Sequence, residues 1–126
     1  MIYSRIAGTG SHLPEKIVTN HDLENIMDTS DQWIRERTGI RERRVISEGE
    51  STTTLAEQAC RKALEAADVD PSEIDLLVMG TTTPDLVFPS SACLIQKKLG
   101  LPDCGAMDVN AACSGFMYAL SVADKY

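Results

Sequence analysis

One cysteine occupies a position at which a thiol can act as a nucleophile. Cys113 lies in the stretch DVNAACSGFMYAL, residues 108–120, where an apolar extended run is expected to give way to a helix. A helix N-terminus stabilises negative charge and therefore favours the reactive thiolate. The small neighbours Ala112 and Ser114 leave room for a substrate and for backbone amides that stabilise an oxyanion. Because free cysteines are more often small core residues, the spacing alone leaves both interpretations open.

The other cysteines indicate neither a metal site nor a disulfide framework. No two of them are spaced as C-x-x-C, and both histidines lie far from them in the sequence, so no metal site is expected. Cys60 and Cys93 lie on expected helices and are predicted to be core residues. Cys104 is predicted to be exposed in a loop.

Neither histidine is a convincing base for the cysteine. A cysteine nucleophile generally needs an activating base or cation. His12 lies in an expected loop and His21 in the first turn of a short helix. Neither is expected at the carboxyl end of a parallel strand, where α/β active sites gather. Both are predicted to be surface or capping residues.

A second group of residues suits a flat ligand that carries negative charge. Five of the seven arginines fall within ten residues, at positions 35, 37, 41, 43 and 44. Trp33 is the only tryptophan, and Arg37 lies four residues later on the same helical face. An indole beside a guanidinium can hold a nucleobase by stacking and cation–π attraction. The alternative is a half-buried tryptophan beside a solvated charged face, in which Glu36 and Glu42 offset the arginines.

Hydrophobic periodicity and turn residues predict the elements that must position these residues. A strand is expected over residues 2–10. Asn20 is predicted to cap one short helix and Ser30 the next, with Gly39 as the left-handed stop. An extended segment, residues 40–47, and a loop follow.

From residue 53 onward the expected order is helix, strand, helix, strand, helix. The helices are predicted over residues 54–70, 90–100 and from about Ser114, and the strands over 74–83 and 105–109. This order predicts an α/β fold with parallel strands joined by right-handed crossovers. The alanines of the first of these helices predict close packing against a neighbouring segment.

Composition excludes several classes of protein. The formal net charge of −7 argues against broad nucleic-acid binding. No apolar run approaches the ~20 residues that span a bilayer, and the first residues lack the pattern of a secretory signal. We therefore expect a cytoplasmic protein with no membrane or nucleic-acid partner.

The last helix suggests that a larger enzyme surrounds it. This helix, which begins near Ser114, is apolar on most of its circumference, which is typical of a helix buried on several sides. The chain ends at Tyr126 without a C-cap, and no following residues cover this helix. We expect residues 1–126 to be the N-terminal part of an α/β enzyme, one incomplete domain.

Three stretches together resemble the β-ketoacyl-acyl-carrier-protein synthase III family of condensing enzymes. They are residues 19–44, 80–100 and 108–120. The resemblance implies a thiolase-like fold, here the N-terminal half of an α-β-α-β-α layered core. It also implies a transferase that starts fatty-acid synthesis.

The resemblance assigns roles to individual residues. Cys113 would accept an acyl group, typically acetyl, from coenzyme A, and malonyl on acyl carrier protein would then decarboxylate and attack that thioester. Trp33 and Arg37 would stack about the adenine of coenzyme A, with Thr29 beside them. Phe88 would reach across a homodimer to close the partner's acyl pocket. The thioester is a substrate, and no cofactor or metal is implied.

The family's histidine and asparagine that assist decarboxylation come from the C-terminal half, and no residue here matches them. We therefore expect these residues alone to be inactive in condensation. A related acyltransferase that uses an acyl-cysteine without decarboxylation remains open, as does a non-catalytic fragment that binds acyl-CoA or dimerises.

Overall fold

The part of the chain that the structure describes, residues 4–101 and 103–126 of a computed structural model, divides into two units. The larger unit contains His12, the described residues before it, and Ser51–Tyr126. The smaller unit is Leu13–Glu50. Each unit is described by itself.

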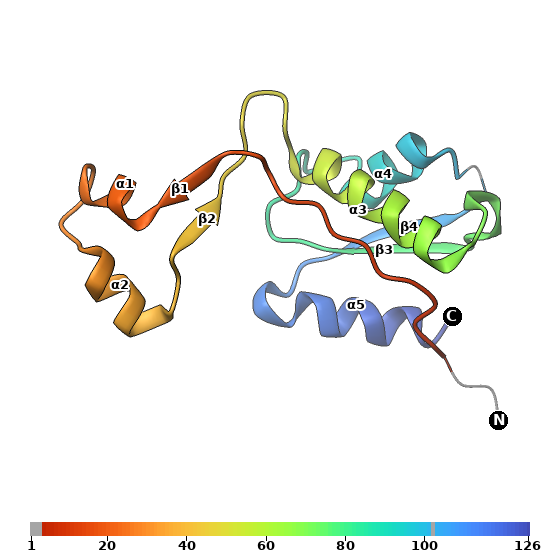
Figure 1. The fold of residues 1–126 in the computed structure, drawn as a ribbon. Coiled ribbons are helices and arrows are strands. Elements are labelled where there is room, and N and C mark those ends of the chain that lie inside the picture. Colours follow the sequence, from red (N-terminus) through yellow and green to blue (C-terminus); the bar gives the residue numbers. More distant parts are fainter. Residues whose placement is uncertain (1–3, 102) are drawn as a thin grey trace. The chain divides into compact units, whose positions relative to one another are not determined.

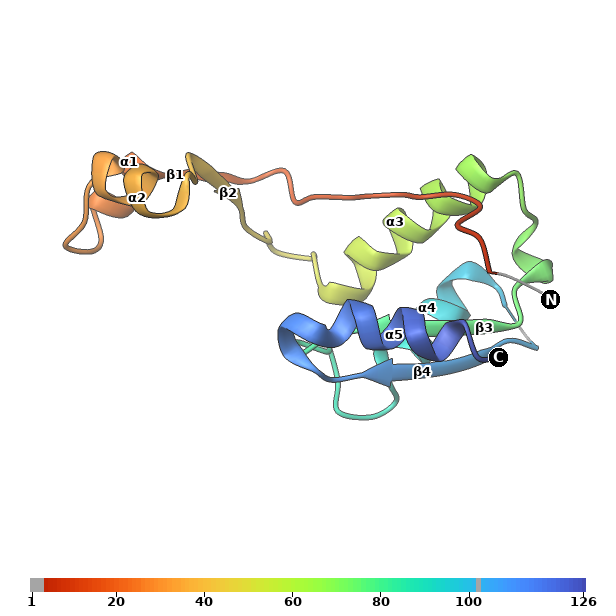
Figure 2. The ribbon, with the colours of Figure 1, turned by 90° about the horizontal axis from the view of Figure 1, so that it is seen from below.

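Two parallel strands form the centre of the larger unit. Their register pairs Leu76 with Gly105 and Gly80 with Val109. Figures 1 and 2 show α3 and α4 on one face of the strand pair and α5 on the other. The element bounds are α3 Thr52–Ala67, β3 Leu76–Gly80, α4 Ser91–Leu99, β4 Gly105–Val109 and α5 Gly115–Ala123. The predicted helix–strand order and the parallel pairing are therefore confirmed.

The core lies between α4, α3 and the strands. Ile95 is completely buried, and Leu99 and Leu101 pack beside it. Cys104 belongs to the same cluster and is only 7% exposed, so its predicted exposure in a loop is wrong. The turn before β4 directs this side chain under α4, where the Gln96 side-chain amide donates a hydrogen bond to the Cys104 carbonyl oxygen at 2.6 Å.

The predicted strand over residues 2–10 is not formed by its described part, residues 4–10. This segment instead runs along α3, as the red trace in Figure 1 shows. A Cβ added at Gly8 would lie 2.5 Å from the Ala63 carbonyl oxygen. The small residues of α3 therefore do pack closely against a neighbour, and that neighbour is the N-terminal segment. Residues 2 and 3 lie outside the described residues.

The smaller unit consists of an antiparallel strand pair and two short helices. Their bounds are β1 Ile17–Thr19, α1 Asn20–Glu24, α2 Asp31–Thr38 and β2 Glu42–Arg44. Ser30 caps α2 by accepting a hydrogen bond from the Trp33 backbone N–H, and Gly39 ends the helix with φ 74°. Both predicted boundaries of this helix are confirmed.

Asn20 does not cap α1 as predicted. Thr19 is the cap, because Asp22 three residues later completes a reciprocal capping box with it. Asn20 is instead fully buried. Its amide donates to Asp31 and to the Ile40 carbonyl oxygen, each at 2.8 Å. This side chain joins α1, α2 and the segment that leads into β2.

Within the described residues, none of the helices combines the length and the apolar character that crossing a bilayer requires.

We predict that Gly10→Ala lowers the free energy of unfolding by about 1–3 kcal/mol, because the new Cβ would overlap the α3 backbone at Ala59 and Ala63. Urea unfolding measures this change. Gly105→Ala is the matched control, since its Cβ would meet the movable Leu76 Cδ1 atom at 3.1 Å. Equal effects of the two substitutions would contradict the packing of this segment on α3.

Candidate active site

Cys113 lies in a tight turn between β4 and α5. Residues Ala112–Ser114 form one turn of 3₁₀ helix, closed by a hydrogen bond from the Ser114 N–H to the Ala111 carbonyl oxygen at 2.9 Å. Helix α5 begins directly afterwards, at Gly115. The Cys113 side chain is exposed. The strand–turn–helix arrangement expected from the sequence is therefore present, with the thiol at the start of the helix.

The residue before the cysteine has an unusual backbone conformation. Ala112 adopts φ 43°, in the left-handed region. For a residue with a Cβ this conformation costs roughly 1–2 kcal/mol, so the surrounding structure must enforce it. Strain of this kind gathers at sites where a side chain has to be aimed in one direction.

A glycine on β3 lets α5 approach closely and thereby positions the turn. A Cβ added at Gly80 would lie 3.0 Å from the Gly115 carbonyl carbon and 3.3 Å from the Phe116 nitrogen. The Thr81 N–H donates to the Val109 carbonyl oxygen at 3.1 Å, which extends the strand pairing to the start of the turn. The cysteine is consequently held at the carboxyl edge of the strand pair, where ligands bind in open α/β sheets.

A carboxylate on β4 anchors the preceding helix, α4. Asp108 accepts hydrogen bonds from the backbone N–H groups of Ser91 at 2.7 Å and Ala92 at 2.8 Å. A carboxylate at this end of α4 is also favoured by the helix dipole. This role of Asp108 was not predicted, although an aspartate within an apolar strand is a usable signal for such a contact.

The remaining cysteines are poorer nucleophiles than Cys113. Burial raises the pKa of Cys60 above its ordinary value. Burial raises the pKa of Cys104 as well, and the nearby Asp75 carboxylate adds to this effect. Cys93 is partly buried, and its sulfur accepts a hydrogen bond from the Ser90 hydroxyl at 3.2 Å. Of the four cysteines, only Cys113 is exposed.

No base contacts the thiol in the described part of the chain, since Cys113 Sγ has no hydrogen-bond partner there. His21 is exposed and pairs with Glu24, and this hydrogen bond raises the pKa of the imidazole. Residues 4–101 and 103–126 also contain no group of three or more His, Cys, Asp or Glu side chains arranged to hold a metal ion.

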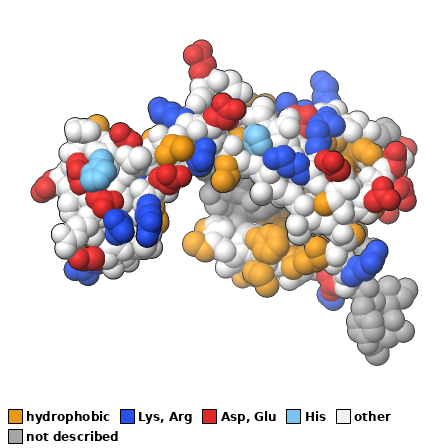
Figure 3. Space-filling model, viewed as in Figure 1, with side chains coloured by type: hydrophobic (Ala, Val, Ile, Leu, Met, Phe, Trp, Pro, Cys, Tyr) orange, Lys and Arg blue, Asp and Glu red, His pale blue; other side chains and the backbone are white. Residues whose placement is uncertain are grey.

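The outer face of α5 is apolar and uncovered. Phe116 is 71% exposed, and Met117, Tyr118 and Leu120 are exposed beside it. Figure 3 shows hydrophobic side chains gathered along this helix. Single exposed apolar residues are ordinary on a protein surface, whereas a contiguous patch marks an interaction face.

Phe88 lies in the loop between β3 and α4. It is 88% exposed, and Val87 before it is fully exposed. The loop is drawn in teal in Figure 1, between the two elements. Phe88 is therefore free to contact another surface.

Trp33 and Arg37 are brought together on α2 as their spacing predicts. The Arg37 guanidinium carbon lies 6.0 Å from the centre of the Trp33 ring, and the indole is 56% exposed. A flat ring between them needs about 7 Å, two stacking distances of about 3.5 Å. A modest movement of the flexible Arg37 side chain opens this gap. Thr29 is partly exposed before the cap of the same helix.

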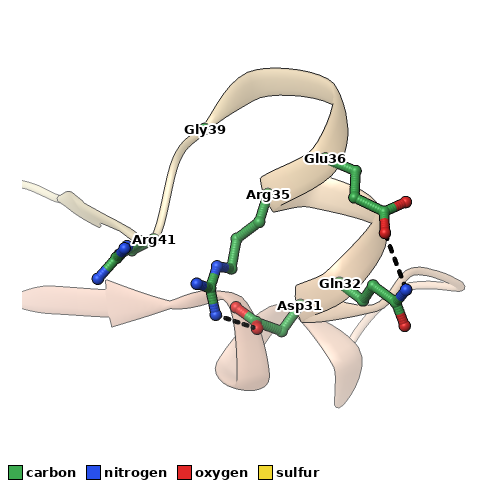
Figure 4. Close-up of a pocket in the computed structure, with 6 residues that line it drawn as sticks. All are labelled: Asp31, Gln32, Arg35, Glu36, Gly39 and Arg41. Carbon is green, nitrogen blue, oxygen red and sulfur yellow. Dashed lines mark hydrogen bonds and ion pairs between the residues drawn. The ribbon is translucent and has the colours of Figure 1, made fainter.

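A cavity of about 450 Å³ lies on another side of α2 (Figure 4). Its charges are largely paired: Arg35 contacts Asp31 at 3.3 Å, and the Gln32 amide donates to Glu36 at 2.8 Å. The hydrogen bond from Asn20 is the chief cause that lowers the pKa of Asp31. This cavity lacks the excess positive charge that a phosphate site requires.

Two arginines of the cluster have structural roles in the smaller unit. Arg43 donates to the Asn20 side chain at 2.9 Å and to the Val18 carbonyl oxygen. Arg44 donates to the carbonyl oxygens of Pro14 and Glu15, in the segment before β1. These two guanidinium groups are therefore engaged within the fold.

No family model matches the chain. Individual relatives do match. A β-ketoacyl-[acyl-carrier-protein] synthase III from Xylella fastidiosa strain Temecula1 is 65% identical over 125 residues, which cover 99% of this chain and 39% of that protein.

Solved structures agree with the relatives. The 3-oxoacyl-[acyl-carrier-protein] synthase III from Aquifex aeolicus VF5 superposes with a TM-score of 0.93 at 51% identity, over 96% of this chain and 39% of that one. The priming β-ketosynthase of the R1128 polyketide pathway superposes with a TM-score of 0.94 at 41% identity, over 98% of this chain and 37% of that one.

The chain matches the N-terminal portion of a β-ketoacyl-acyl-carrier-protein synthase III. The resemblance drawn from the sequence motifs and the thiolase-like fold class are both confirmed. The chain spans about two-fifths of the length of the synthase III relatives it matches.

We predict that iodoacetamide modifies Cys113 at least about tenfold faster than Cys60 or Cys104 at about pH 7, because only the exposed thiol is accessible and burial leaves the other two less ionised. Raising the pH should speed labelling of Cys60 as its thiolate fraction grows. Peptide mass spectrometry gives each rate, and Cys113→Ser is the control. Equal rates at Cys113 and Cys104 would contradict the burial described above.

Proposed function

We propose that this chain is part of a cytoplasmic condensing enzyme that joins an acyl-CoA primer, acetyl-CoA in the first instance, to malonyl-acyl carrier protein. The observation that supports it best is the exposed Cys113 on a strained turn at the start of α5, in a chain so similar to synthase III enzymes. The activity requires a C-terminal half that supplies the remaining catalytic groups and covers α5.

In the proposed reaction the Cys113 thiolate attacks the carbonyl carbon of the acyl-CoA. The new C–S bond forms as the bond to coenzyme A breaks, and coenzyme A leaves as a thiolate that takes up the proton lost by the Cys113 thiol. Malonyl on the carrier protein then loses CO₂, and the electron pair of that C–C bond attacks the acyl-cysteine. The cysteine is released and a β-ketoacyl carrier protein results. The N-terminus of α5 favours the thiolate at both stages.

Three residues of α2 and its approach are proposed to bind coenzyme A. Trp33 and Arg37 hold the adenine between the indole and the guanidinium, and Thr29 lies beside the ring. The exposed indole and its 6.0 Å separation from the guanidinium carbon support this role. Phe88, almost fully exposed, is proposed to close the acyl pocket of a second copy in a homodimer.

A second candidate is a module that binds acyl-CoA without condensing activity. The lack of a base at Cys113 within the described residues favours it, because a thiol without an activating group reacts slowly. Acyl transfer to the cysteine distinguishes the two candidates.

We predict that the protein gains one acetyl group when it is incubated with acetyl-CoA, and that Cys113→Ser removes this gain. Intact-mass measurement followed by peptide mapping locates the group. Cys104→Ser is the matched control, since that thiol is buried and should not react. Coenzyme A binding without acylation would support the binding module instead.

We predict that Trp33→Ala weakens coenzyme A binding by about 5- to 150-fold, the range that corresponds to a lost aromatic–base stack of about 1–3 kcal/mol. Isothermal titration calorimetry measures the dissociation constant. Arg37→Ala should weaken binding as well, whereas Arg35→Ala, which removes the same charge from α2 but pairs with Asp31, should not. An unchanged affinity in Trp33→Ala would rule out the stacking role, provided that iodoacetamide still labels Cys113.

A further inference from the structure

The loop between β3 and α4 is fastened at both ends and free in the middle. At one end Asp85 contacts the first turn of α3. At the other end, Ser90 caps α4 by accepting a hydrogen bond from the Cys93 N–H at 3.3 Å. Asp108 accepts hydrogen bonds from the N–H groups of Ser91 and Ala92. Between these anchors, Val87 and Phe88 are almost completely exposed.

Asp85 makes the long-range anchor. Its carboxylate accepts hydrogen bonds from the Ser51 hydroxyl at 2.7 Å, from the Thr53 hydroxyl, and from the Thr53 backbone N–H at 3.3 Å. Thr53 is 2% exposed, so its hydroxyl has little access to water. A buried hydroxyl that loses its partner costs stability, which makes this contact hard to give up.

Helix α3 also has a local cap. Ser51 and Thr54 form a reciprocal capping box that pairs the Ser51 and Thr54 N–H groups. The Thr53 N–H between them has its acceptor in Asp85. The carboxylate therefore completes the cap of α3 and at the same time joins the loop to this helix.

A second contact strengthens the same attachment. The Thr52 hydroxyl donates to the Thr83 carbonyl oxygen at 2.6 Å, two residues before Asp85.

Burial raises the pKa of Asp85, but hydrogen bonds from Thr53 and Ser51 outweigh burial and leave the pKa below its ordinary value. The carboxylate thus stays charged, and the attachment intact, until the pH falls below the usual range of an aspartate.

We propose that Asp85 is a positioning residue that, by binding the first turn of α3, holds the loop in the conformation that presents Phe88. Only Leu86 and Val87 separate the two, so release of the carboxylate frees the exposed segment between the anchors. The consequence for primer choice rests on the proposed function, in which Phe88 closes an acyl pocket. Asp85 then affects primer choice without touching the primer.

The test uses the full-length enzyme and three variants. Asp85→Ala removes every contact, and Asp85→Asn retains one acceptor oxygen and should behave between Asp85→Ala and the unaltered protein. Asp70→Ala is the matched control, because Asp70 caps the short 3₁₀ turn at Pro71–Glu73 through Ser72, and not this loop. Thermal unfolding of each variant verifies that it is folded. If Asp85→Ala does not fold, Asp85→Asn is used in its place.

Two measurements are made on each variant. Hydrogen–deuterium exchange of the Thr53 and Thr83 amides, which donate to Asp85 and to the Thr81 hydroxyl, should accelerate in both Asp85 variants and not in Asp70→Ala. The ratio of kcat/KM for acetyl-CoA to that for isobutyryl-CoA should change by about 3- to 10-fold, the range expected for the loss of one capping contact. A general loss of stability lowers both rates together and leaves this ratio unchanged.

Unchanged exchange in Asp85→Ala would overturn the proposal. Faster exchange with an unchanged primer ratio would overturn the role in primer choice. If the unaltered enzyme takes no acyl group onto Cys113, the proposed function itself fails, and exchange alone then decides whether Asp85 holds the loop.

Discussion

The contact between α5 and β3 is the constraint on which the site depends. Gly80 lets the two backbones approach so closely that a Cβ there would require the start of α5, at Gly115 and Phe116, to move. This approach directs the N-terminus of α5 at the carboxyl edge of the strands, and it leaves a turn of only a few residues for Cys113. A bulkier residue at Gly80 would displace the helix start and the thiol together. The position of the thiol therefore depends on one residue that has no side chain.

Carboxylates distant in sequence attach the loops to this framework. Asp108 on β4 binds the start of α4, and Asp85 in the loop between β3 and α4 binds the start of α3. Each helix already has a serine at its own cap, Ser90 and Ser51. The serines cap their own helices, whereas the aspartates join each helix start to a segment distant in the sequence. The starts of α3 and α4 are thus the points at which a loop and a strand are attached to the helices.

Local signals in the sequence predicted most of the elements, and long-range contacts explain the errors. Ser30 and Gly39 bound α2 as predicted, because a cap and a left-handed stop act within a single turn. The side chain of Asn20 was wrongly read as a cap, since its true partners are Asp31 and a carbonyl oxygen twenty residues away. Cys104 has the sequence context of a loop, yet packing beneath α4 buries it. The predicted strand over residues 2–10 failed for the same reason, as its described residues pack on a helix instead of pairing with a strand.

The left-handed conformation of Ala112 has a consequence for engineering. Glycine adopts this conformation at almost no cost, so Ala112→Gly would relieve the turn and is the kind of substitution that a search for thermostable variants selects. Glycine would also widen the range of backbone angles open to the residue before Cys113. The more stable protein would then have a less well-oriented thiol. Loss of the Ala112 methyl group would thus raise stability and lower the reactivity of Cys113.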